Sequence, residues 1–218
     1  MTYDEIRAYE PIRIYIREAD RILLSLGYTE HSFAHVTAVA KNAGGILHNL
    51  GFPPRTVELA RIAGFLHDIG NLVNRIEHSQ SGAIMAFGLL TSLGFDAKEI
   101  AVITTAIGNH DEGTGVPVDP VAAALILADK SDVRRTRVRN TDFSAFDIHD
   151  RVNYSVLGAD LDVDSTKKEI SLRLTVDTSI SSVMDYFEIF LSRMILCRKA
   201  AERLSLRFCL LINDQRLL

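Results

Sequence analysis

The 218-residue sequence has no tryptophan, two cysteines and five prolines. Cys197 and Cys209 alone cannot build a disulfide framework or a cysteine-based zinc site, so reduced thiols are expected. The sequence also lacks a Walker phosphate loop, a G-x-G-x-x-G fingerprint, a G-x-S-x-G elbow and an H-E-x-x-H pair. The nucleotide-binding and hydrolytic classes that these motifs identify are therefore excluded.

Long apolar runs and a strong charge of one sign are absent too. The longest uninterrupted apolar segment, residues 121–128, is far too short to span a bilayer, and the N-terminus is acidic. We therefore expect a cytoplasmic protein without a membrane partner. A formal net charge of −4 predicts no extended nucleic-acid surface. The length suits one domain, or one domain with a small appendage.

The chain is organised around residues 64–70, where adjacent His67 and Asp68 end an apolar helix that begins at Pro53-Pro54. Gly70 then breaks the helix. An imidazole beside a carboxylate offers a nitrogen and an oxygen ligand to a divalent ion. The end of a helix also favours a cation, because its last carbonyl groups are unpaired.

Two further segments carry inward-facing polar residues. A helix is expected over residues 29–51, on which His35 shares a face with His31 and with apolar positions. Taken alone, His35 could equally be a core histidine bonded to a carbonyl. Asp129 ends the apolar helix that starts after Asp119-Pro120, and a carboxylate buried there needs a metal or a cationic partner.

Other polar residues follow helices or begin them. His78 precedes a helix that runs to Gly94, and an Asp96–Glu99 capping box is expected to start the helix before His110 and Asp111. The arginines at positions 134, 135, 137 and 139 form either a solvated helix end or a phosphate contact.

The character of the sequence changes after residue 140. Alternating patterns predict strands over residues 152–157 and 170–176, followed by a helix over 181–204 and a strand over 208–212. The expected fold is mainly α, with a helical domain over 1–140 and a small β-β-α-β subdomain over 141–218. Such short sheets need another surface to be stable, so the subdomain is expected to pack on the core or to form a homodimer.

The order His35, His67-Asp68, Asp129 resembles the H…HD…D signature of the HD-domain metal-dependent phosphohydrolases, over roughly residues 25–135. The segments "HSQSGAIMAFGLL" and "NHDEGTGVP" are similar to the HD-GYP group, in which a second metal is bound. Departures from that group are Asn71, Asn109, Asp111 and Val116, which argue against cyclic dinucleotide hydrolysis. Asn109 stands where that group has a histidine, so the second metal site is expected to be weaker.

The resemblance implies a helical HD core and a phosphohydrolase acting on a small phosphorylated, nucleotide-like substrate. It implies one tight site for Mn, Fe, Co, Ni or Zn and a weaker second one, with Asp68 shared; the metal ligands expected are His35, His67, Asp68, His78, His110 and Asp129. Catalytic roles are expected for Asp68, His110, Asp111 and Lys130, and substrate contacts for His31, Asn109, Arg134 and Arg135. The alternatives are a regulatory nucleotide-binding protein and a di-iron oxygenase of the HD fold.

Overall fold

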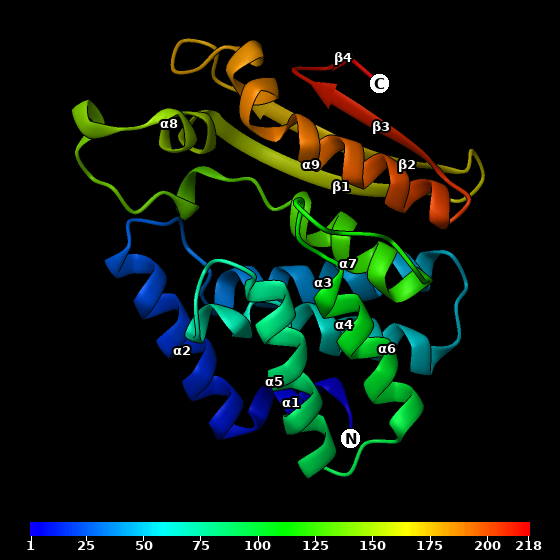
Figure 1. Ribbon diagram of the computed structural model, residues 1–218. Helices are drawn as coiled ribbons and strands as arrows, with labels where there is room; N and C mark the ends of the chain where they lie inside the picture. The colour runs from blue at the N-terminus through cyan, green and yellow to red at the C-terminus, as the bar shows by residue number, and fades with distance from the viewer.

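The computed structural model describes residues 1–218, and the first 130 of them form a bundle of helices (Figure 1). The elements of this helical core are α1 (Tyr3–Ala8), α2 (Glu10–Ser25), α3 (Phe33–Asn49), α4 (Pro54–Leu66), the 3-10 helix η1 (Ile69–Leu72), α5 (His78–Ser92), α6 (Ala97–Gly108) and α7 (Pro120–Lys130).

Helix α7 lies in the middle of the molecule. All of its side chains from Val121 to Lys130 are buried, and α3, α4, α6 and α9 pack around it. A helix that is apolar on every side is stable only in such a position. The Asp119 side chain accepts a hydrogen bond from the amide of Ala122, and Pro120 occupies the first turn. The start of α7 is therefore fixed as the sequence predicts. Asp129 lies near the other end of this helix.

Two local expectations about the helical core are wrong. Helix α3 begins at Phe33, because the side chain of Ser32 caps the amide of Ala34, so His31 lies in the preceding loop and shares no helical face with His35. The capping box of α6 is incomplete. Asp96 caps the amide of Lys98, but the Glu99 carboxylate accepts a hydrogen bond from Arg55 Nε at 2.6 Å instead of turning back to the cap.

The C-terminal part adds a small mixed sheet and its helices. It comprises η2 (Arg135–Arg137), η3 (Phe143–Ala145), α8 (Ile148–Ser155), β1 (Val156–Asp164), β2 (Glu169–Val176), α9 (Val183–Arg203), β3 (Arg207–Ile212) and β4 (Gln215–Arg216). The strand order is β1-β2-β3-β4. Strand β2 pairs antiparallel with β1 and parallel with β3, and α9 makes the crossover between the parallel strands.

The strand expected over residues 152–157 is wrong except for its last two residues, which begin β1, whereas the later strands and the long helix are confirmed. Residues 148–155 form α8, which starts where Asp147 accepts a hydrogen bond from the amide of Asp150. Val152 and Ser155 face inward on this helix. Over so few residues, the spacing of buried positions in a helix cannot be told from the alternation of a strand.

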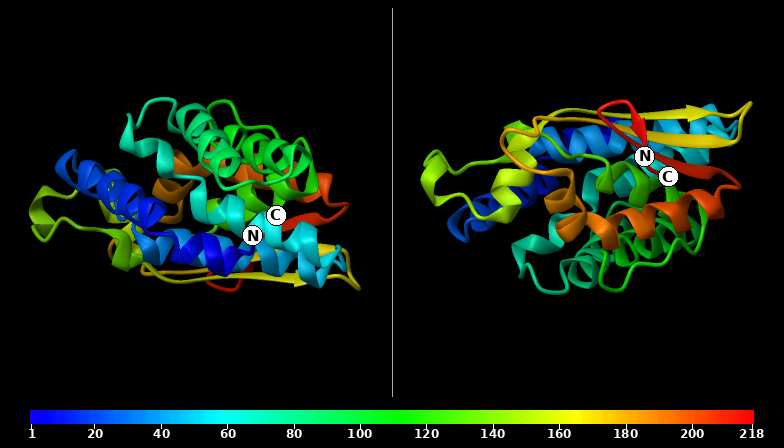
Figure 2. Two further views of the ribbon diagram at one scale, coloured as in Figure 1. Left: turned by 90° about the horizontal axis from the view of Figure 1, so that it is seen from below. Right: turned by 90° about the horizontal axis from the view of Figure 1, so that it is seen from above.

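The two parts share one apolar core, since the buried side chains of β2, β3 and α9 continue into those of α7 and α3. Two further views show the sheet and α9 lying along one side of the helical bundle (Figure 2). The fold is thus mainly helical with a C-terminal mixed sheet, as expected. None of the helices combines the length and the apolar composition that crossing a membrane requires. A homodimer stays a prediction.

Candidate metal centre

Six buried polar side chains from five separate segments meet at one place in the helical core. They are His35 of α3, His67 and Asp68 after α4, His78 at the start of α5, His110 after α6, and Asp129 near the end of α7. Each of them is 9% exposed or less. The structure thus brings together all six side chains that the sequence singles out as metal ligands.

Two glycines allow the segments to approach this closely. A Cβ atom on Gly64 would lie 2.8 Å from the Cα of Ala40, so α4 can cross α3 tightly only with glycine there. A Cβ on Gly70 would lie 2.0 Å from the carbonyl oxygen of His78, which presses η1 against the start of α5. The close crossing brings His67 toward His35, and the second contact brings His78 toward Asp68.

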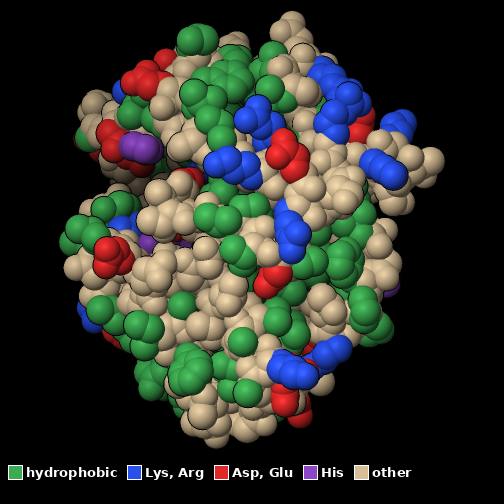
Figure 3. Space-filling view, turned by 45° about the vertical axis from the view of Figure 1, so that its right-hand side comes forward, with side chains coloured by type: hydrophobic (Ala, Val, Ile, Leu, Met, Phe, Trp, Pro, Cys, Tyr) green, Lys and Arg blue, Asp and Glu red, His purple; other side chains and the backbone are tan.

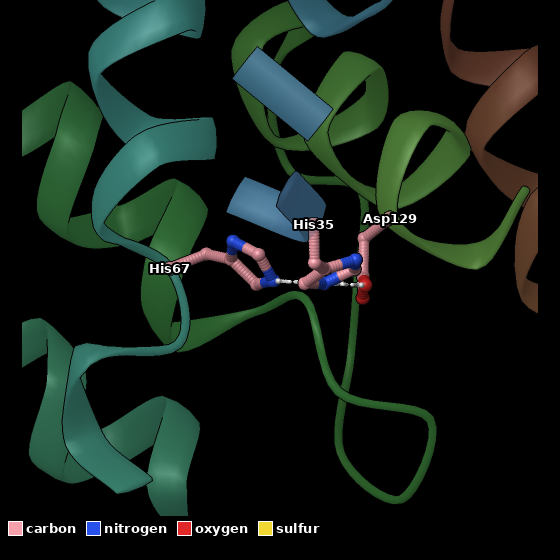
Figure 4. Close-up of side chains that lie close together, drawn as sticks. All are labelled: His35, His67 and Asp129. Carbon is pink, nitrogen blue, oxygen red and sulfur yellow. Dashed lines mark hydrogen bonds and ion pairs between the residues drawn. The ribbon is translucent and has the colours of Figure 1, made fainter. Parts of the chain in front are cut away.

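The first group of ligand atoms consists of His35, His67 and Asp129 (Figure 4). The Nε2 atoms of the two histidines lie 3.3 Å apart. Oδ1 of Asp129 lies 3.4 Å from Nε2 of His35 and 3.6 Å from Nε2 of His67. Oδ2 of Asp68 lies 3.5 and 3.3 Å from the same two nitrogens. Two imidazoles and two carboxylates therefore face a common point.

The second group lies on the other side of Asp68. Oδ1 of Asp68 is 3.5 Å from Nε2 of His78, and this nitrogen is 3.2 Å from Nε2 of His110. His110 also belongs with His67 and Asp68 to a set whose ligand atoms all lie within 4.8 Å of one another. One carboxylate, Asp68, thus directs an oxygen to each group.

The remote nitrogens orient all four rings. The Nδ1 atoms of His67, His78 and His110 face the carbonyl oxygens of Gly64, Arg75 and Ile107 at 2.8, 3.1 and 2.6 Å, and Nδ1 of His35 faces the carboxylate of Asp132 at 2.7 Å. With Nδ1 donating, each neutral imidazole presents Nε2 as an acceptor. Facing acceptors need a cation between them.

The oxygen atom Oδ2 of Asp68 supports the same conclusion, because it is buried and has no hydrogen-bond partner. Buried carboxylate oxygens are normally paired or bound to a metal. The mixed nitrogen and oxygen set suits a divalent transition metal. The residues present therefore fit such an ion, and the second group could hold another.

The electrostatics of the site favour a cation as well. Burial alone would lower the pKa of His67, but Asp68 and Asp129 raise this pKa to about 10. Burial alone would raise the pKa of Asp68, yet His67 and the neighbouring histidines hold it well below its ordinary value. The carboxylates thus stay ionised, and without a metal they hold a proton on His67, in the place that a bound cation would take.

The centre opens into a cavity of about 430 Å³ between the helical core and the C-terminal part. His31 and Lys130 line it, together with Asp68, His78, His110 and Asp129. Figure 3 shows the surface hollowed on its left side, with histidine, acidic and basic side chains around the hollow. The C-terminal part contributes to this wall the residues Arg137, Asp147, His149, Asp150, Asn153, Phe190 and Arg193.

Four predicted residues lie outside the cavity wall. Asn109 donates a hydrogen bond to the carbonyl of Thr105, and Asp111 does not reach the cavity. Arg134 binds the carboxylates of Asp132 and Glu30, and Arg135 donates to the carbonyl of Tyr154. Helix packing and neighbouring acceptors therefore direct these side chains elsewhere.

Three arginines line the cavity that are not named among the expected substrate contacts: Arg75, Arg137 and Arg193. Arg137 belongs to the arginine run, where the sequence pattern could not tell which members face inward. Arg75 follows Asp68 by seven residues, a closeness in sequence that could have drawn attention to it. Nothing in the local sequence distinguishes Arg193 from the other basic residues of α9.

The fold and the site together define a helical domain with a buried histidine and aspartate centre of metal-ligand chemistry. The HD domain family model matches residues 32–134, which span α3 to α7 and all six side chains. The region from α3 to α7 is therefore similar to the HD domain family. This family is the one that the order of His35, His67-Asp68 and Asp129 indicates.

Individual relatives add detail. An uncharacterized protein of Methanocaldococcus jannaschii is 25% identical over 213 residues, which cover 87% of this chain and 80% of that protein. Ribonuclease Y of Enterococcus faecalis is 34% identical over 116 residues, 52% of this chain but only 21% of that protein. A solved structure described as a predicted HD superfamily hydrolase, from an uncultured Thermotogales bacterium, is 27% identical over 57% of this chain and 68% of its own, with a TM-score of 0.46.

Proposed function

We propose that the protein is a metal-dependent phosphohydrolase that acts on a small phosphorylated, nucleotide-like molecule. The observation that carries this proposal is the position of Asp68. Its carboxylate directs one oxygen to His35 and His67 and the other to His78, and Oδ2 has no hydrogen-bond partner. A carboxylate placed in this way can join two ligand groups around a reacting phosphate.

Each side chain of the centre has a role in this function. A divalent metal, when bound, polarises a phosphoryl oxygen and lowers the pKa of water. Nε2 of His35 and of His67 and the oxygens of Asp68 and Asp129 would hold it, and His78 and His110 would hold a second ion. Lys130, whose Nζ lies 2.6 Å from Oδ2 of Asp129, balances the negative charge of that carboxylate. Burial of the centre excludes bulk water and strengthens these interactions.

The cavity supports a small substrate. A volume of about 430 Å³ accommodates a nucleotide-sized ligand. Its wall carries the basic side chains of Arg75, Lys130, Arg137 and Arg193, which suit a phosphate group. The ribonuclease Y relatives bear a name that describes RNA cleavage, and the matched region is only about a fifth of their length. RNA is therefore one substrate to be tested.

A substrate panel after metal analysis tests the proposal. Protein purified without chelator would be assayed on nucleoside monophosphates, cyclic nucleotides, a chromogenic phosphomonoester and a short single-stranded RNA. We expect metal-dependent release of phosphate or cleavage, lost in His67→Ala. The matched control is His48→Ala, since His48 is exposed on α3 and distant from the centre in the bundle.

Other outcomes would replace the proposal. Metal-bound protein that binds nucleotides tightly but turns over none of the panel with Mn, Fe, Co, Ni or Zn would favour a regulatory binding protein. A visible absorption band of a diferric centre together with oxygen consumption would favour an oxygenase. Turnover confined to RNA would keep the reaction class and change the substrate.

A further inference from the structure

The long helix of the C-terminal part reaches the metal centre. Helix α9 packs directly on α7, the helix that carries Asp129 and Lys130 (Figure 1). From α9, Phe190 and Arg193 line the cavity. Helix α9, which follows the matched HD domain region in sequence, therefore forms part of the cavity wall.

A chain of charges connects Arg193 to the centre. Nε of Arg193 lies 2.6 Å from Oε1 of Glu112, and the other oxygen of Glu112 lies 3.1 Å from Nζ of Lys130. Lys130 in turn contacts Asp129. Glu112 lies in the loop after α6. Its carboxylate thus binds Lys130 of the helical core and Arg193 of the C-terminal part at the cavity wall.

The guanidinium group of Arg193 is fixed but not saturated. Its Cζ lies 4.3 Å from the centroid of the Phe190 ring, so the group rests on an aromatic face. Only Nε makes a hydrogen bond, and both terminal nitrogens are without a protein acceptor. The side chain is 23% exposed. A planar guanidinium held at one edge, with its other donors free in a cavity, is preorganised for a two-point contact with a phosphate.

The other inward cations differ in this respect. Lys130 is 5% exposed in its side chain and already makes two ion pairs. Arg137 donates to the carbonyl oxygens of Glu30 and Asp132, and its side chain is 7% exposed. Arg75 contacts Asn71 and His78 and has no acidic partner. Nη1 of Arg137 also lies 3.8 Å from the carboxylate of Asp132, but that side chain is almost fully buried. Arg193 therefore differs from the other three because it combines an anchoring carboxylate with free donors on a partly exposed side chain.

We infer that Arg193 is a substrate-binding residue that contacts the phosphoryl group, so that α9 completes an active site begun by the HD domain. This inference rests on the proposed function for the choice of a phosphoryl ligand. It makes the C-terminal part a component of the phosphate site and not only a support for the helical core. Glu112 positions Arg193 and Lys130 on the same side of that ligand.

The test uses inorganic phosphate as the probe, with the metal-loaded full-length protein in a calorimetric titration. Arg193→Met should weaken phosphate binding by roughly 10- to 100-fold, because a charge-assisted two-point contact is lost. Arg193→Lys keeps the ion pair with Glu112 but lacks the planar guanidinium group that makes a two-point contact, so it should still weaken phosphate binding. Metal content should equal that of the wild type in both variants. The matched control is Arg198→Met on the same helix, whose side chain is 58% exposed.

The measurement separates the inference from the proposed function. Phosphate binding that depends on Arg193 in a protein without hydrolytic activity supports the inference and removes the proposed reaction. Wild-type affinity for phosphate in both Arg193→Lys and Arg193→Met overturns the inference, even if the enzyme hydrolyses phosphate esters. A wild-type protein that binds no phosphate overturns it as well. When a substrate is found, KM should rise in Arg193→Lys more than kcat falls.

Discussion

Nδ1 of His35 lies 2.7 Å from Oδ2 of Asp132, on the side of the ring that faces away from the metal centre. Asp132 is itself held by Arg134, whose Nε lies 2.6 Å from Oδ1. The carboxylate thus fixes the ring of His35 with Nε2 toward His67 and Asp129. Arg134, which the sequence suggested as a substrate contact, lies behind this carboxylate and not in the cavity.

The first prediction concerns Asp132. Asp132→Asn should lower metal affinity by about 10- to 100-fold, since the partner that orients a ligating histidine and raises its basicity is weakened. Competition with a chromophoric chelator measures this. Asp160→Asn, on the exposed edge of β1, is the matched control and should leave affinity unchanged. Equal affinities in wild type and Asp132→Asn would show that the contact is not needed.

The second prediction is that the group around His78 binds its ion more weakly than the group around His35. Nη1 of Arg75 lies 3.5 Å from Nε2 of His78, so a cationic side chain already faces this ligand. His78→Ala should retain one tightly bound ion. Metal titrations with and without inorganic phosphate would measure both sites, and phosphate should raise occupancy of the second. Two equally tight sites without phosphate would contradict the prediction.

The position of Asn109 bears on this point. The sequence suggests a weak second site because Asn109 stands where the HD-GYP group has a histidine. In the structure the Asn109 side chain donates to Thr105 and does not line the cavity. The structural reason to expect weaker metal binding at the second group is therefore the Arg75 side chain that faces His78. The relative metal affinity of the two groups stays a prediction.

The third prediction uses two glycines near α5. Gly70→Ala should destabilise the protein by about 1–3 kcal/mol, because the added Cβ would overlap backbone atoms at His78 and Gly82. Gly88 lies within α5, with no atom within 4 Å of an added Cβ, so Gly88→Ala should stabilise the protein by about 0.5–1 kcal/mol. Urea denaturation of both variants measures the difference. A change of the same sign in the free energy of unfolding of both variants would rule out this account of the contact between η1 and α5.

The fourth prediction concerns alkaline stability. Burial raises the pKa of the Cys197 thiol from its ordinary 9.0 to about 12. Between these values the unfolded chain loses this proton while the folded chain keeps it. The thiol therefore contributes nothing to pH dependence below pH 9, and above it the free energy of unfolding should fall by about 1.4 kcal/mol per pH unit.

The difference between wild type and Cys197→Ala isolates this contribution. Their unfolding free energies, measured at a series of pH values from 7 to 11, should run parallel up to pH 9. Above that pH the wild-type curve should fall more steeply, because the alanine variant has no thiol to ionise. Curves that stay parallel throughout would mean that Cys197 titrates normally in the folded protein.

The sequence predicted the core of the site because its signals are local. His67-Asp68 and Asp129 each end an apolar helix, and His35 lies on an inward helical face, so burial of all four follows from periodicity. Helix ends at Gly70 and Gly94 could be read in the same way. The six expected ligands lie near the ends of helices, and His35 and His78 lie in the first turns of α3 and α5.

Features that depend on packing between distant segments could not be predicted. Arg193 reaches the cavity only because α9 lies on α7, and the sequence of α9 does not encode that contact. The sequence predicts a helix from residue 29 that would include His31, but Ser32 takes the cap and α3 begins at Phe33. Alternation misled the interpretation of residues 152–157, where the competing signal was the cap at Asp147.

The central claim, that these side chains form a metal centre, is tested most directly by metal analysis. Wild type, Asp68→Ala and Asp160→Asn would be purified without chelator, and bound transition metal would be measured per chain by mass spectrometry. Asp68 is the carboxylate shared by both groups. The account predicts at least one metal ion per chain in wild type and in Asp160→Asn, and a near-complete loss in Asp68→Ala with the fold retained. Full metal content in Asp68→Ala would contradict it.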